Sequence, residues 1–502
     1  MTKILEYING FVWGVPALLL ILGVGLYLTV RTGAVQLTLF PKAMKLFISK
    51  FSNRHRKSDG VSGYQALCTA LAATVGTGNL AGVAGAIAIG GPGSIFWMWI
   101  CAFFGMVTKY AEAVLAVRYR QKNAHGELVG GPMYIIRNGL GKKWTWLAGV
   151  YCFFGVVAAF GVGNATQINA VIGGINSVLS SVGVVGSKGL DIAIGILLAM
   201  MVGLMLSGGA KRIGTVAEKL VPFASIAYLL LGAGVLLLRA TAVPSAFCSI
   251  VRGAFSPKAV TGGMLGSAFQ ALRIGASRGV FTNEAGMGTA SIAHAAAQVE
   301  HPAEQGLMGI VEVFLDTIVI CTMTALVILC SGVIIPYGTD EGVTLTANAF
   351  SAIYGQWVNI PIALALCCFA FATILGWGLY GARCAQYLFG DTAWRSFAVF
   401  QSATVILGAI LKTQTVWMLS ETVNGLMAIP NLIAIAWLSP ELIRLTREYK
   451  HRRGRRNAVG GTYENFNQCK SMRAVTYAQV PSAGSAGKAA GKEDLSSEYW
   501  SA

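Results

Sequence analysis

Charged residues are scarce in this chain of 502 residues. They make up 12% of it, whereas an average soluble domain has about 25%. Hydrophobic residues make up 55%, and apolar runs of about 20 residues recur, long enough to cross a hydrocarbon core of about 30 Å as helices. The deficit of charge excludes an ordinary soluble domain and predicts an all-α, polytopic membrane protein whose solvent is the lipid bilayer.

The sequence also lacks the signatures of several other functions. Its ten cysteines include no C-x-x-C pair and its five histidines are scattered, so neither a disulfide framework nor a metal cluster is expected. No set of His, Cys or acidic residues has the spacing of a nucleophile and its base, so we do not expect an enzyme. The net charge is +17, but the basic residues fall between apolar runs, where they indicate topology rather than nucleic acid binding.

The apolar runs predict eleven transmembrane helices. The opening run, 11–31, has no small-residue cleavage site behind it, so we expect it to stay in the membrane rather than to be removed as a signal peptide. A short helix is expected at 343–355. Ten core helices follow the opening one, near 62–89, 91–117, 146–176, 190–207, 215–239, 262–297, 304–335, 357–387, 394–411 and 415–438.

The distribution of Lys and Arg gives these spans an orientation. Segments assigned to the cytoplasm contain 28 of the 38 basic residues, segments assigned outside contain six, and four lie within or at the ends of spans. Cytoplasmic loops carry the excess of positive charge in membrane proteins. We therefore predict a multi-pass protein of a bacterial inner membrane, with its N-terminus outside and its C-terminus in the cytoplasm.

An internal repeat divides the core helices into two sets. An aromatic-Gln-Ala-Leu sequence occurs at 64–67 and again at 269–272, and a Thr follows ten residues later in each copy, at Thr77 and Thr282. Five spans separate the copies, an odd number, so the second copy enters the membrane in the opposite direction. This predicts an inverted five-plus-five repeat, the alternative being chance similarity of two Ala- and Gly-rich helices. The predicted parts are 1–61 (extra helix and basic loop), 62–240 and 241–440 (the two repeats) and 441–502 (a basic, disordered cytoplasmic tail).

Glycine and polar residues interrupt two of the predicted spans near their middle, at 75–79 (VGTGN) and 279–288 (GVFTNEAGMG). A break that faced lipid would leave backbone groups unpaired at several kcal/mol each, so such segments are expected where they line a cavity. Freed N–H groups attract a carboxylate and freed carbonyls, here of Val75 and Gly76, coordinate a cation. Close helix packing is the other use of such glycines, but it does not account for Asn79, Asn283 and Glu284.

Other polar residues lie on spans that are otherwise apolar. In the third core helix Gln167 is a candidate for the substrate pocket, the alternative being an interhelical hydrogen bond. In the eighth, Thr373 is a candidate cation ligand through its hydroxyl, and Trp377 a candidate pocket wall or gate.

Charged residues inside spans have separate interpretations. Lys109 and Glu112 are three residues apart, so we expect a local ion pair. Glu312 and Asp316 share a helix face and are candidates for an ion path, unless they pair with an arginine or with backbone. Glu284 lies at the second break itself and is a candidate partner of a substrate ammonium or of the cation.

Three segments resemble a known family. Residues 90–99 (GGPGSIFWMW), 130–134 (GGPMY) and 283–286 (NEAG) are similar to signatures of the sodium–alanine/glycine symporter family, and the likeness covers roughly residues 10–440. The resemblance implies a LeuT-like fold with one extra N-terminal helix, symport of alanine or glycine, and sodium as the coupling ion, with no other cofactor. It also implies that the substrate contacts Thr77, Gly78, Asn79, Gln167, Phe281, Thr282, Asn283 and Trp377.

These observations predict a secondary active symporter that couples inward Na⁺ flow to the uptake of a small neutral amino acid. Proton coupling and a preference for glutamine remain open, because some members of the family are linked to each. A channel or a receptor of similar architecture is a further alternative. The sequence leaves open the stereoisomer, the stoichiometry and the oligomeric state.

Overall fold

Helices make up most of the chain in the computed structural model, which describes Gly10 and residues 13–52, 60–181, 183–255, 268–339, 342–409 and 413–458. Within these residues six helical segments are long and apolar enough to cross a membrane, and eight if each of two bent pairs counts as one span. The six are Gly93–Tyr119, Lys142–Ser180, Lys188–Leu206, Gly209–Leu238, Pro302–Ser331 and Gln356–Phe389. The bent pairs are Gly63–Thr74 with Gly78–Gly90 (51°) and Thr422–Trp437 with Ser439–His451 (61°). The expectation of a helical membrane protein is confirmed, whereas the count of eleven spans stays a prediction.

The helices of the first half of the chain are α2 (Val15–Thr32), α3 (Val35–Thr38), α4 (Phe40–Ser52), α5 (Gly63–Thr74), α6 (Val83–Gly90), α7 (Gly93–Tyr119), α8 (Pro132–Ile135), α9 (Thr145–Phe160), α10 (Thr166–Ser181), α11 (Lys188–Leu206), α12 (Gly209–Leu238) and α13 (Val243–Phe255). Those of the second half are α14 (Ala268–Asn283), α15 (Thr289–Ala295), α16 (Pro302–Val313), α17 (Thr322–Ser331), α18 (Val343–Tyr354), α19 (Asn359–Phe389), α20 (Ala393–Gly408), α21 (Thr413–Trp437) and α22 (Ser439–Ala458). The strands are β1 (Val61–Ser62), which pairs in parallel with β4 (Ala297–Gln298), and β2 (Gln121–Lys122), which pairs antiparallel with β3 (Leu128–Val129).

Among the described residues, three helices of 13 or more residues lie where the sequence predicted none. α4 and α13 have 13 residues each, too short to give the apolar run of a span. α22 replaces the first part of the predicted disordered tail, because Leu442 and Leu445 are buried and the Thr446 hydroxyl lies 3.0 Å from the hydroxyl of Tyr110. Residues 459–502, the rest of that tail, lie outside the described residues.

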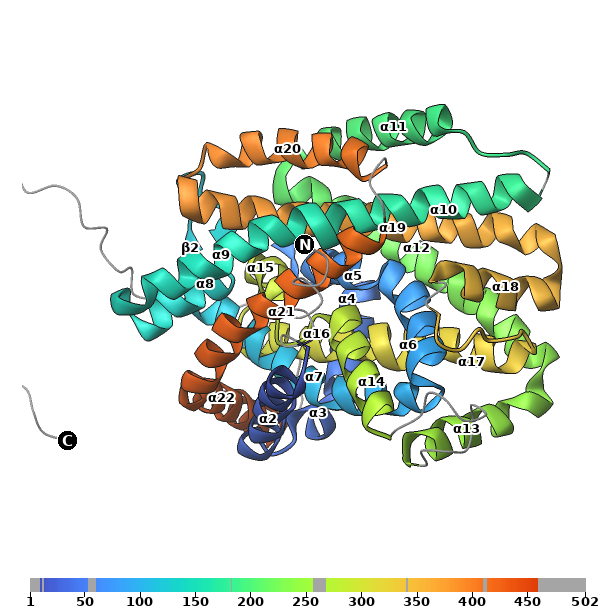
Figure 1. Cartoon of the computed structure of the whole chain (residues 1–502). Coiled ribbons are helices and arrows are strands. Elements are labelled where there is room, and N and C mark those ends of the chain that lie inside the picture. The colour runs from blue at the N-terminus through green and yellow to red at the C-terminus, as the bar shows by residue number, and fades with distance from the viewer. Residues whose placement is uncertain are drawn as a thin grey trace, which may run out of the picture. The chain divides into compact units, whose positions relative to one another are not determined.

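Two long helices organise the packing around the breaks. α7 packs against α2, α14, α15 and α16, whereas α19 packs against α5, α9, α10, α12 and α20. Figure 1 shows α10, α19 and α20 running alongside one another, with α7 and α14 on the other side of α5 and α21. The first broken span therefore lies between two groups of helices and contacts both.

The two spans that contain the predicted breaks, α5 with α6 and α14 with α15, are tied together at one end. β1, which leads into α5, pairs with β4, which follows α15. α5 then begins with a capping box, in which the Ser62 hydroxyl accepts from the Gln65 backbone N–H and the Gln65 side chain accepts from the Ser62 N–H, both at 3.1 Å. These reciprocal bonds satisfy N–H groups that a helix start leaves free.

Candidate substrate and ion site

The first break begins directly after α5. Val75 is extended, and a π-helical segment, Gly78–Gly82, follows before α6. Glycine is about 1 kcal/mol less favourable than alanine in a helix, so Gly76 and Gly78 weaken this turn. The backbone N–H of Gly76 donates instead to Oδ1 of Asn79 at 2.8 Å. The interruption predicted at 75–79 is thus confirmed at Val75 and Gly76, before the chain becomes helical again, and Asn79 closes it with its own side chain.

Side chains of the third and eighth core helices reach the first break from one side. The Thr77 hydroxyl donates to Oε1 of Gln167 at 3.1 Å, and the Thr373 hydroxyl donates to the Ala72 carbonyl at 3.0 Å. A Cβ atom added to Gly76 would lie 2.5 Å from Oγ1 of Thr373 and 3.6 Å from Oε1 of Gln167. Gln167 and Thr373 therefore lie where the sequence suggested, against the freed backbone.

A carboxylate holds the other side of the first break. The amide of Asn79 donates to Oδ1 of Asp316 at 2.7 Å, and the Thr317 hydroxyl donates to Oδ2 at 2.8 Å. The Asn283 amide donates to the Thr317 hydroxyl at 3.2 Å. Asp316 and Thr317 lie in a π-helical segment, Phe314–Cys321, between α16 and α17. This hydrogen-bonded chain links the first break to the end of α14.

Phe281 and Thr282 pack against the first break as well. A Cβ atom added to Gly78 would lie 3.3 Å from a Thr282 methyl carbon and 3.7 Å from the Phe281 ring. Trp377 is buried one helical turn from Thr373, where it faces Gly163 of the third core helix and lies edge-to-face with Tyr380. No hydrogen bond that joins Trp377 to the first break is present among the described residues, so its role in the pocket stays a prediction.

The second break starts later than predicted. α14 continues into the predicted break (279–288) as far as Asn283, with the last helical bond from the Glu284 N–H to the Val280 carbonyl at 2.8 Å. Gly279 stays helical and packs closely on the next helix, because a Cβ there would lie 3.3 Å from Cβ of Cys101. The helix ends where the backbone turns left-handed, at Glu284 (φ 54°), Gly286 (φ 95°) and Gly288 (φ 80°). Glutamate rarely adopts this conformation, so the surrounding contacts hold it there.

Glu112 of α7 binds the freed backbone of the second break. Its Oε1 accepts from the N–H groups of Gly286 at 2.9 Å and Gly288 at 3.1 Å, and from the Asn431 amide at 2.8 Å. Asn431 also donates to the Gly286 carbonyl at 2.8 Å. Nothing local in the sequence connects residue 112 with residues 286 and 431. The sequence signal for Glu112 is an acidic residue within an apolar span.

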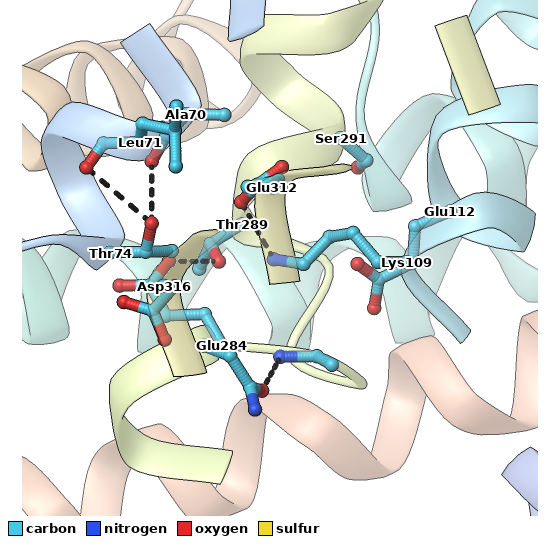
Figure 2. A network of polar contacts seen from close by, with 12 residues as sticks. Ala70, Leu71, Thr74, Lys109, Glu112, Glu284, Thr289, Ser291, Glu312 and Asp316 are labelled. Atoms are coloured by element: carbon cyan, nitrogen blue, oxygen red, sulfur yellow. Dashed lines mark hydrogen bonds and ion pairs between the residues drawn. The ribbon is translucent and has the colours of Figure 1, made fainter. Parts of the chain in front are cut away.

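The expected ion pair between Lys109 and Glu112 is wrong. The Lys109 ammonium lies 3.2 Å from Oε1 of Glu312, and Figure 2 shows this contact, with none from Lys109 to Glu112. The other oxygen of Glu312 lies 2.8 Å from Nε2 of His294, whose Nδ1 faces the Gln305 amide at 2.7 Å. Glu312 therefore pairs with Lys109 and His294 rather than with an arginine, because helix packing places them at the same depth.

Glu284 lies in the second break and not among the other proposed cation ligands. Its Oε2 accepts from the Thr289 hydroxyl at 2.6 Å (Figure 2). In the described part of the chain no hydrogen bond joins it to Val75, Gly76 or Thr373. The structure thus brings together seven of the eight predicted substrate residues and three of the four predicted cation ligands around the first break.

Carboxylates outnumber cations in this buried region. Glu112, Glu284, Glu312 and Asp316 are each 2% exposed or less, and Lys109 is fully buried beside Glu312. Buried charges are costly unless they are paired or hydrogen-bonded. The surplus of carboxyl groups next to unwound backbone favours the binding of cations or protons.

Known proteins resemble this chain over most of its length. The sequence model of the sodium:alanine symporter family matches residues 1–460. The chain is 42% identical to the sodium/alanine symporter AgcS of Methanococcus maripaludis, covering 89% of this chain and 97% of that protein. It is 35% identical to a probable sodium/glutamine symporter, GlnT, of Bacillus subtilis, covering 89% of this chain and 91% of that one.

A solved structure shares the fold. The crystal structure of MhsT in complex with L-phenylalanine superposes with a TM-score of 0.55 at 14% sequence identity, over 78% of this chain and 99% of that chain. At this identity the likeness concerns the fold alone. The family match, with the apolar helices, makes the chain a membrane transporter and confirms the family that the sequence motifs suggested. The chain belongs to the sodium:alanine symporter family.

Proposed function

We propose that this protein is a secondary active symporter that couples the inward flow of Na⁺ to the uptake of a small neutral amino acid, alanine or glycine. We also propose that the chain crosses a bacterial inner membrane eleven times, with ten of the spans in a five-plus-five inverted repeat. The N-terminus then lies outside and the C-terminus lies in the cytoplasm. The observation that carries it is the first break, where unwound backbone meets polar side chains from three other helices.

The carboxylate and the side chain of an amino acid suit different parts of this region. The substrate carboxylate binds the backbone around Thr77, Gly78 and Asn79, where a π-helical segment begins. Gln167 and Asn283 supply polar contacts, while Phe281, Thr282 and Trp377 limit the side-chain volume. The narrow space at Gly78, set by Phe281 and Thr282, suits a substrate as small as alanine.

The coupling cation binds the carbonyl end of α5. Val75 contributes a freed carbonyl oxygen, and Gly76 contributes a carbonyl oxygen that also accepts from the Asn79 backbone N–H at 3.3 Å. Thr373 contributes a hydroxyl that already lies 3.0 Å from the Ala72 carbonyl. Hard cations prefer such neutral and anionic oxygen ligands. Glu284 acts on this site through its charge, since its carboxylate bonds to Thr289 in the second break.

Ion coupling supplies enough energy for concentrative uptake. Moving one positive charge inward at 100 mV provides about 2.3 kcal/mol, and a tenfold cation gradient adds about 1.4 kcal/mol. One cation per cycle therefore sustains a substrate gradient of several hundredfold.

The direct test is uptake of radiolabelled alanine by proteoliposomes with an imposed inward Na⁺ gradient. We expect accumulation above the external concentration that collapses when the gradient is removed, and competition by unlabelled glycine. Uptake that is indifferent to the gradient, or flux that only equilibrates alanine, would favour a channel or a receptor. Stronger competition by glutamine than by glycine would show a glutamine-preferring carrier, a specificity that the name of one relative suggests.

Proton coupling is the second candidate. The observation that favours it is that Asp316 and Glu284 accept hydrogen bonds from neutral groups, Asn79, Thr317 and Thr289, and no ion pair of either is present among the described residues. A carboxylate without a cationic partner is the kind of group that carries a proton through a membrane. Accumulation driven by an imposed pH gradient in the absence of Na⁺ would establish it.

A further inference from the structure

The second break has the donors of an anion site, and the protein supplies the anion itself. Two backbone N–H groups, of Gly286 and Gly288, and the side-chain amide of Asn431 all donate to Oε1 of Glu112. Three donors on one oxygen suit a charged acceptor, because hydrogen bonds to charged groups are roughly twice as strong as neutral ones. The carboxylate is fully buried.

No other role for Glu112 competes with this one. Lys109, its neighbour on α7, pairs directly with Glu312 instead. The second oxygen of Glu112, Oε2, is buried and accepts no hydrogen bond from the described residues. Backbone N–H groups cannot release their protons, so these contacts form no proton path. All hydrogen bonds of the carboxylate go to the second break and to the residue of α21 that spans it.

We propose that Glu112 is a positioning residue of the transport cycle, a built-in anion that fills the second break and thereby reserves the first break for the carboxylate of the transported amino acid. The inference rests on the proposed function, since it concerns where the substrate's anionic end binds. Because Asn431 bonds both to Glu112 and to the Gly286 carbonyl, the carboxylate also ties α21 to the second break. Loss of the charge therefore misplaces Glu284 and the end of α14, where Phe281 and Thr282 pack against the first break.

Chemical rescue separates this role from a merely structural one. The full-length protein and the variants Glu112→Ala and Glu112→Gln are reconstituted in proteoliposomes, with gluconate, chloride or formate as the only anion on both sides. In gluconate we expect Glu112→Ala to lose Na⁺-driven alanine uptake by about 10- to 100-fold, as the loss of hydrogen bonds to a charged group predicts. Formate and chloride, which are small enough to occupy the vacated volume, restore uptake severalfold, while the wild type responds to neither.

Asn431→Ala is the matched control. It removes a donor and leaves the carboxylate in place, so its uptake falls but shows no dependence on the anion. An equal response of this variant to formate would mean that the anion acts elsewhere and would overturn the proposal. So would wild-type uptake by Glu112→Gln in gluconate, or a folded Glu112→Ala protein whose uptake neither anion restores.

A second readout does not depend on transport. Formate is expected to raise the thermal unfolding midpoint of purified Glu112→Ala and to leave that of the wild type unchanged, because only the variant has unpaired donors at the second break. If the wild type takes up no alanine, the proposed function fails, and the midpoint shift still decides whether Glu112 is a built-in anion. An unchanged midpoint in formate would overturn the inference by itself.

Discussion

The two breaks differ in what holds their backbone. In the first break, most of the hydrogen bonds are to neutral groups. The side-chain amide of Asn79 accepts from the Gly76 N–H, the Thr77 hydroxyl donates to Gln167, and the Thr373 hydroxyl donates to a carbonyl of α5. In the second, the carboxylate of Glu112 accepts from two backbone N–H groups at once.

Because of this difference, we expect the first break to exchange its hydrogen bonds for those of a ligand and the second break to keep its own. A neutral hydrogen bond contributes about 1 kcal/mol, whereas one to a charged group contributes about 1.5–3 kcal/mol. A ligand replaces the neutral contacts of the first break at little cost, while those of the second break resist replacement. We therefore expect one open binding segment rather than two equivalent ones.

The largest effect is expected when the first break loses its closing side chain. Asn79→Ala removes the acceptor of the Gly76 N–H and a donor to Asp316, which leaves a buried carboxylate short of a partner. Together these losses predict a reduction of alanine uptake by about 100-fold or more. Proteoliposome uptake measures it, and a reduction smaller than that of Asn431→Ala would reverse the ranking of the two breaks.

Adding one methyl group to each break gives a second contrast. In Gly76→Ala the new Cβ would lie 2.5 Å from the Thr373 hydroxyl. We therefore expect the Na⁺ concentration for half-maximal uptake to rise about tenfold or more, the scale of a lost ligand contact. In Gly286→Ala the φ of 95° instead penalises the fold by about 1–2 kcal/mol. Na⁺ titrations of uptake and thermal unfolding of both variants compare them. Equal loss of stability with equal Na⁺ dependence would contradict the distinction.

Removing one hydroxyl tests the proposed cation site. Thr373→Val keeps the side-chain shape but loses the bond to the Ala72 carbonyl and the proposed ligand oxygen. We expect the Na⁺ concentration for half-maximal uptake to rise about five- to tenfold, with little change in maximal rate. Thr346→Val, which also loses a hydroxyl bonded to backbone of the first broken span, the Leu80 carbonyl at 3.1 Å, is the control. The same shift in both variants would show a packing effect.

A smaller effect is expected from Glu284→Gln. The glutamine oxygen still accepts from the Thr289 hydroxyl, so the fold of the second break is kept and Na⁺-driven uptake falls only by about a few-fold, the scale of exchanging a charged for a neutral hydrogen bond. Uptake by this variant is compared under a Na⁺ gradient and under a pH gradient. Loss confined to proton-driven uptake would instead assign the coupling to protons.

The smallest effect is expected far from both breaks. Glu127, in the loop between β2 and β3, bonds to Arg383 at 2.8 Å and is about half-exposed. Burial opposes its ionisation, but the hydrogen bond and charge of Arg383 outweigh this and lower the pKa of Glu127. A lowered pKa stabilises the folded protein at pH values above the ordinary carboxyl pKa. This contribution is lost as the pH falls through the lowered pKa of the folded state. Thermal unfolding of Glu127→Gln should therefore differ from wild type at neutral pH and converge with it in acid, with alanine uptake within about twofold, as for a surface pair. A loss of uptake comparable to that of Asn79→Ala would contradict this.

Sequence reasoning located the parts of the site that depend on local chemistry. Glycines beside polar residues indicated both breaks, and polar side chains on apolar spans indicated Gln167 and Thr373. It placed the second break too early, because Gly279 looks like a helix breaker until its packing against Cys101 is known. It also missed the left-handed conformation of Glu284, which no sequence rule predicts for a glutamate.

The pairing of buried charges was beyond local reasoning. Lys109 is three residues from Glu112 and far in sequence from Glu312. It nevertheless pairs with Glu312, because the close packing of α7 against α16 brings the two side chains together. Hydropathy likewise predicted spans but not their π-helical segments, Gly161–Ala165 in the third core helix and Phe314–Cys321, which contains Asp316. Such turns arise from tertiary contacts as much as from local propensity.

A structure of the protein with bound alanine and Na⁺ tests the central claim most directly. The account predicts the alanine carboxylate on the backbone of residues 77–79, with the bonds from Gly286 and Gly288 to Glu112 unchanged. An alanine carboxylate seated on Gly286 and Gly288, with Glu112 displaced, would contradict it.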